Sequence, residues 1–105
     1  MGGDAGVGII RISGPNALKA AKHCTRGFDN PSPRYAHRIF IIDPKTKAEL
    51  DDGIALLFLK GESFTGEEVV ELQLHGGRFL LQTILSTLLS TRLCSYSCEC
   101  GCIIS

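Results

Sequence analysis

The sequence predicts an α+β domain in which helices pack on one face of a mixed or antiparallel sheet. Three observations lead to this fold class. Short β-branched runs alternate between apolar and polar residues, two segments carry apolar residues at helical spacing, and these elements follow the order strand, helix, strand, strand, strand, helix. The chain has 105 residues, enough for one domain, which we expect to span residues 1–90.

The first strand and the first helix are expected near the start of the chain. Residues 7–12 form a β-branched run that predicts a strand whose side chains face alternately to its two sides. Residues 13–16 then supply a cap candidate and a proline. The helical pattern begins at Ala17, and Gly27 is its expected stop.

Three further strands follow a proline-containing loop. Residues 35–42 and 53–59 predict a hairpin with a long connection, and the second run is apolar enough for a more buried strand. Residues 69–74 alternate again, and glycines end this strand. Residues 78–90 then form the clearest amphipathic helix, with apolar positions at Leu81, Ile84, Leu85 and Leu88.

Composition and charge exclude several classes of protein. Hydrophobic residues make up 44% of the chain and charged residues 21%, which is ordinary for a soluble globular domain. Eleven basic residues balance eleven acidic ones, which argues against a strongly basic nucleic-acid binder. No apolar run reaches the roughly 18 residues of a membrane span, and no targeting segment is recognisable at the start. We therefore expect no membrane partner.

Cysteine usage divides the chain unevenly. Cys24 stands alone in the domain, whereas four cysteines crowd residues 91–105, a divergent tail that we expect to be disordered; they are Cys94, Cys98, Cys100 and Cys102. A secreted disulfide scaffold would distribute its cysteines through the fold, so the domain is expected to be reduced. Zinc binding by the tail and prenylation at Cys102 remain alternatives, although the spacing does not match paired zinc knuckles.

Two charged residues interrupt the apolar strand patterns and are candidates for ligand binding. Arg11 lies in the first predicted strand, and Glu71 shares one face of another with Gln73 and His75. Such a face can grip a heterocycle with amide-like edges through paired donors and acceptors. The alternative is a polar face that simply meets solvent. Gly76, directly after His75, would allow the backbone to approach a ligand closely.

The glycine-rich opening does not form a nucleotide-phosphate loop. It precedes a strand rather than following one, and it lacks the Lys-Ser/Thr ending of a Walker A loop. We therefore assign no GTP, Mg²⁺ or K⁺ site, no catalytic residue and no metal site to this chain.

Four segments together resemble one known family, the N-terminal domain of the tRNA modification GTPase MnmE, also called TrmE. They are GVGIIRISGP at 6–15, PRYAH at 33–37, SFTGEEVVELQLHGG at 63–77 and the leucine-rich helix that follows. The resemblance implies a fold similar to the folate-binding unit of the glycine-cleavage T-protein. It also implies homodimerisation and binding of a reduced folate, 5-formyl-tetrahydrofolate, as a one-carbon source or its analogue.

Site residues and partners follow from the same resemblance. The folate-contacting Arg and Glu of the family fall on Arg11 and Glu71, with Ser13, Gln73, His75 and Gly76 as weaker candidates. In the family the complete GTPase works with a flavin-dependent partner to modify the wobble uridine of certain tRNAs. Its location is mitochondrial in eukaryotes, which we favour here, and cytoplasmic in bacteria.

The chain departs from the family after residue 90. The tail replaces a family segment that carries a further folate-contacting Lys, and the GTPase motifs are absent, so we expect a shortened form without GTP hydrolysis of its own. The alternative is a structural dimerisation fragment that binds no folate and pairs with a full-length copy. Its expected interface residues are Leu80, Leu81, Leu88 and Leu89.

Overall fold

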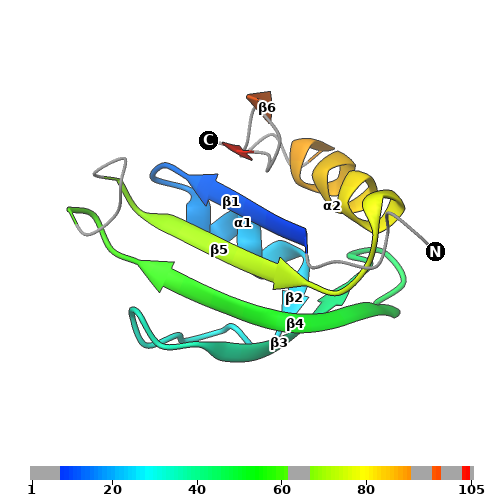
Figure 1. Cartoon of the computed structure of the whole chain (residues 1–105), viewed down its shortest axis with the longest axis horizontal. Coiled ribbons are helices and arrows are strands. Elements are labelled where there is room, and N and C mark those ends of the chain that lie inside the picture. The colour runs from blue at the N-terminus through cyan, green and yellow to red at the C-terminus, as the bar shows by residue number, and fades with distance from the viewer. Residues whose placement is uncertain (1–7, 62–66, 91–95, 98–102, 105) are drawn as a thin grey trace.

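A computed structural model describes residues 8–61, 67–90, 96–97 and 103–104, which form one layer of strands and one of helices (Figure 1). The elements in chain order are β1 (Gly8–Ser13), α1 (Ala17–His23), β2 (Thr25–Arg26), β3 (His37–Ile42), β4 (Glu49–Phe58), β5 (Val69–Leu74), α2 (Arg78–Ser90), β6 (Tyr96–Ser97) and β7 (Ile103–Ile104). The predicted α+β class is therefore confirmed.

The strands form a mixed sheet in the order β2-β3-β4-β5-β1-β7-β6. The pairs from β2 to β1 are all antiparallel, whereas β7 runs parallel to β1. The first strand thus lies beside β5, although about sixty residues separate them in the chain. Pairing β1 with β5 therefore places the first strand beside a strand from the second half of the chain.

Both helices pack on the same face of the sheet and enclose the core. The strands β1, β3, β4 and β5 contribute alternate apolar residues, so that Ile10 and Ile12 in β1 face the helices together with Leu72 in β5. From α2, Ile84 and Leu88 enter the same core, as the helical spacing predicts. In the described part of the chain, no helix packs against the opposite face, which we call the open face.

Burial corrects one part of the dimerisation hypothesis. Leu88 is fully buried in the core of its own domain, so it is not available for contact with a second copy. Leu80 and Leu81 are half-buried and pack against this core. The side chain of Leu89 lies outside the described residues.

The fourth strand differs from its prediction in length and in burial. It begins at Glu49 rather than residue 53, and it alternates, with Ala55 and Leu57 buried and Ile54 exposed between them. The strand is therefore buried on one side only, because helices cover only one face of the sheet.

The first helix also ends earlier than predicted, at His23 rather than near Gly27. The Thr25 hydroxyl donates a hydrogen bond to the Ala21 carbonyl at 2.8 Å, and the chain then pairs with β3. Gly27 has φ +101°, so it forms the turn after β2 instead of the helix stop.

The tail prediction concerns mostly residues outside the described part. The two pairs that are described, Tyr96–Ser97 and Ile103–Ile104, form short strands at the β1 side of the sheet. The disorder expected for the rest stays a prediction, as do the zinc and prenylation alternatives. None of the helices in the described ranges is both long and apolar enough to cross a membrane.

Glu68 is expected to stabilise the start of α1 from outside the helix. The cap residue Asn16 makes no side-chain cap bond, whereas the Glu68 carboxylate accepts a hydrogen bond from the Leu18 N–H at 3.0 Å. Glu68→Ala should reduce the free energy of unfolding by about 1 kcal/mol, the usual cost of a lost cap. Chemical denaturation measures this loss, and Glu68→Gln, which keeps an acceptor oxygen, should restore most of it. Equal losses in both variants would contradict the capping role.

Candidate functional site

An ion pair between the two predicted residues lies on the open face. Arg11 in β1 and Glu71 in β5 are directly opposite each other in the antiparallel register. The Arg11 Nε donates to Glu71 Oε2 at 2.9 Å, and the Arg11 side chain is 45% exposed whereas that of Glu71 is 16% exposed. The sheet register thus brings together two charges that the sequence separates by sixty residues.

Gln73 holds the second oxygen of the same carboxylate. Its Nε2 donates to Glu71 Oε1 at 3.1 Å, so both carboxylate oxygens accept a side-chain hydrogen bond. The contact with Glu71 uses one of the five N–H donors of Arg11. Arg11, Glu71 and Gln73 therefore form one hydrogen-bonded group, which we call the polar trio, in which both carboxylate oxygens are held and the Arg11 side chain is partly exposed.

Apolar side chains border the polar trio on the open face. Ile9 in β1 and Ile54 in β4 are the register partners of Gln73 on its two sides, and they are 36% and 40% exposed. Leu56 in β4 is the partner of Glu71 and is half-buried. A flat ring placed here would meet apolar surface while its edges reach hydrogen-bonding groups.

Ser13 belongs to the end of β1, two residues beyond Arg11. It is buried, and its hydroxyl lies 3.4 Å from Glu67 Oε1. Of residues 63–67, which begin one of the family motifs, only Glu67 lies in the described part of the chain.

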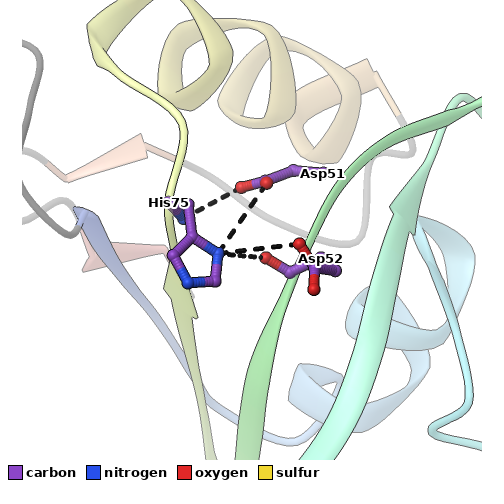
Figure 2. Close-up of side chains that lie close together, drawn as sticks. All are labelled: Asp51, Asp52 and His75. Carbon is purple, nitrogen blue, oxygen red and sulfur yellow. Dashed lines mark hydrogen bonds and ion pairs between the residues drawn. The ribbon is translucent and has the colours of Figure 1, made fainter.

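His75 and Gly76 belong to a second cluster, shown in Figure 2. His75 follows the end of β5 and contacts two consecutive carboxylates of β4, those of Asp51 and Asp52. The Gly76 N–H donates to Asp51 Oδ2 at 2.9 Å. His75 is four positions beyond Glu71, or roughly 13 Å along a strand. The six candidates therefore do not converge on one point.

Asp51 and Asp52 were missed in the sequence because the predicted strand began after them. Two adjacent acidic residues next to a glycine look like part of a turn, especially after the polar run at 43–47. Their role follows from strand pairing, which places β4 beside the end of β5. Residues 49–52 are Glu-Leu-Asp-Asp and carry no apolar alternation, so no local pattern marks them as part of the strand.

Comparison with known proteins establishes the family. Residues 1–99 match the family model described as the N-terminus of GTP-binding protein TrmE, so the chain belongs to this family of N-terminal domains. This confirms the resemblance drawn from the sequence motifs.

The individual relatives of the chain are named tRNA modification GTPases. Over 84 residues the chain is 50% identical to the tRNA modification GTPase MnmE of Marinomonas sp. (strain MWYL1), covering 80% of this chain and 18% of that protein. MnmE of Saccharophagus degradans is 51% identical over 83 residues, covering 79% and 18%. The mitochondrial tRNA modification GTPase mss1 of Schizosaccharomyces pombe is 47% identical over 83 residues, covering 79% and 16%. The chain thus spans less than a fifth of the length of these relatives, which include both bacterial and mitochondrial proteins.

Proposed function

We propose that this chain acts as the folate-binding and dimerisation module of a GTPase that modifies the wobble uridine of tRNA. The names of its relatives support the tRNA-modification context. The observation that carries the folate assignment is the polar trio, in which Arg11 and Gln73 hold the Glu71 carboxylate on the open face. We also propose that the domain shares the fold of the folate-binding unit of the glycine-cleavage T-protein.

The polar trio matches the functional groups of 5-formyl-tetrahydrofolate. A pterin ring offers paired N–H donors, which a fixed carboxylate such as Glu71 can accept. The guanidinium of Arg11 suits a pterin oxygen or a carboxylate of the ligand, and Ile9 and Ile54 offer apolar surface to the ring. This division of roles needs no catalytic residue in the chain.

Three of the four weaker candidates lie farther from the ring position than Arg11 and Glu71, whereas Gln73 belongs to the polar trio. Ser13 lies beyond Arg11 on β1, and His75 and Gly76 lie beyond the other end of β5. They would contact only parts of the ligand that extend past the ring. We expect their replacement to affect folate binding less than replacement of Arg11 or Glu71.

Partners and location complete the proposal. The chain would pair with a second copy or with a full-length protein of the same family, and act with a flavin-dependent partner on tRNA. Mitochondria are the favoured location in a eukaryote and the cytoplasm in a bacterium. The sequence shows no Walker A loop, so GTP chemistry is not assigned to these residues.

Calorimetric titration of the reduced chain with 5-formyl-tetrahydrofolate tests the folate assignment. We expect saturable one-to-one binding, weakened at least tenfold by Arg11→Ala and by Glu71→Ala, or about 1.4 kcal/mol each. Arg26→Ala is the matched control, because it removes another strand ion pair, with Glu49, at the far side of the sheet. It should leave the affinity unchanged.

A structural dimerisation module without folate binding is the second candidate. The exposed Ile9 and Ile54 favour it, because apolar residues on an open sheet face suit contact with another protein. The absence of binding heat from folded protein would support this candidate over the first. Sedimentation as a monomer at tens of micromolar would contradict dimerisation in either case.

A further inference from the structure

An imidazole nitrogen and two carboxylates converge where β4 passes the end of β5 (Figure 2). The His75 Nδ1 lies 3.9 Å from Asp51 Oδ1 and 3.7 Å from Asp52 Oδ1. One donor atom from each residue lies within 4.8 Å of the others. The backbone carbonyl oxygen of Asp52 also lies here and accepts a hydrogen bond from Nδ1 at 2.8 Å.

The Asp51 carboxylate is held in place by groups that would not themselves bind a metal. Its Oδ2 accepts hydrogen bonds from the backbone N–H groups of His75 and Gly76, each at 2.9 Å. Its side chain is 13% exposed. Because Oδ2 is occupied, Oδ1 is the oxygen that faces the imidazole. Such support from surrounding groups orients ligands in protein metal sites.

The spacing suits a small divalent cation. Neighbouring ligands around tetrahedral Zn²⁺ lie about 3.3 Å apart, since each is about 2.0–2.2 Å from the metal. The two distances from Nδ1 to the carboxylate oxygens, 3.9 and 3.7 Å, are longer than this value, and all three donor atoms lie within 4.8 Å of one another, so binding requires them to move closer together. The His75 side chain is 68% exposed and the Asp52 side chain 40%, so both have room for a small rotation, and water can complete the coordination.

The chemistry of the donors favours a transition metal over Mg²⁺. One imidazole and two carboxylates combine a nitrogen with hard oxygens, as in many Zn²⁺ sites, whereas Mg²⁺ prefers oxygen alone. Two carboxylates also balance the charge of a divalent ion. In the structure Nδ1 carries the imidazole proton, which it donates to the Asp52 carbonyl; for metal binding this proton must move to Nε2, so that the metal replaces the hydrogen bond at Nδ1.

We propose that Asp51, Asp52 and His75 bind a divalent transition-metal ion, with Zn²⁺ as the ion that fits the donor set. The bound ion would join β4 to the turn between β5 and α2. The site is distinct from the polar trio, which lies roughly 13 Å away along β5. The metal proposal therefore does not depend on folate binding.

Calorimetric titration with ZnCl₂ tests this proposal, in the full chain with the four tail cysteines changed to Ser. This background removes the thiolates that would otherwise compete for zinc. We expect saturable one-to-one binding, weakened at least tenfold by His75→Ala and by Asp52→Asn. His23→Ala is the matched control, because His23 is also exposed but lies outside the cluster, and it should bind like the background protein.

Thermal unfolding with and without ZnCl₂ provides a second readout. Zinc should raise the midpoint of the background protein and of His23→Ala, but not of His75→Ala or Asp52→Asn, because only binding to the folded state stabilises it. All these substitutions are at partly or fully exposed side chains, and circular dichroism verifies that each variant is folded. Failure of the folded background protein to bind zinc, or equal binding by all variants, would overturn the proposal.

Discussion

Replacing Phe28 by Ala is expected to reduce the free energy of unfolding by about 3–5 kcal/mol, the usual cost of removing a buried aromatic side chain. Phe28 is 1% exposed and has the largest fully buried side chain among the residues that the structure describes. Its ring meets the His37 ring edge-on at 5.7 Å. Because domains are stable by only about 5–15 kcal/mol, this loss should be visible as a large shift of the urea midpoint.

Tyr35→Ala is the control for this experiment. Tyr35 lies in the same connection between β2 and β3, but it is 69% exposed. Its replacement should change the stability by no more than about 0.5 kcal/mol. Similar midpoints for the two variants would mean that the connection does not anchor the core through Phe28.

The burial of Phe28 could not be predicted from the sequence. The chain around it carries prolines and polar residues, and this composition correctly indicates a loop. A periodic pattern identifies buried residues only inside a helix or strand. In an irregular segment no period marks the residue that turns inward, so the largest core side chain was not predicted.

Elements with a strong local pattern were predicted to the residue. The strand at 69–74 and the helix at 78–90 have the same bounds in the structure as in the sequence analysis. Alternation and helical spacing reflect burial on one face, which each element carries in its own sequence. The early end of α1 and the longer β4 instead depend on pairing with distant strands, which no local pattern reports.

The candidate site also has features that the sequence predicts and features that only the structure reveals. Arg11 and Glu71 are recognisable in the sequence as charges inside apolar strands, and the family resemblance supplies their expected role. Their direct pairing depends on the register of β1 against β5. The bond from Gln73 and the separation of His75 from the polar trio likewise required the structure.

Gly53→Ala is expected to destabilise the domain by about 1–3 kcal/mol, in the range of an overpacked core position. A Cβ at Gly53 would overlap the Gln73 carbonyl oxygen and lie 3.0 Å from Leu74 Cδ2. The first contact is with the backbone of β5, so relief requires a shift of the strand itself. Urea denaturation measures the loss of stability.

Gly8→Ala separates this backbone contact from the general effect of adding a methyl group. Its Cβ would come within 2.7 Å of Leu81 Cδ1, the end of a side chain that can rotate away. We therefore expect a smaller loss of stability for Gly8→Ala than for Gly53→Ala, and the reverse order would contradict the argument. Because the shift at Gly53 falls on Gln73, which holds the Glu71 carboxylate, folded Gly53→Ala should also bind 5-formyl-tetrahydrofolate more weakly than folded Gly8→Ala. The same pair of variants thus tests whether the polar trio depends on the spacing between β4 and β5.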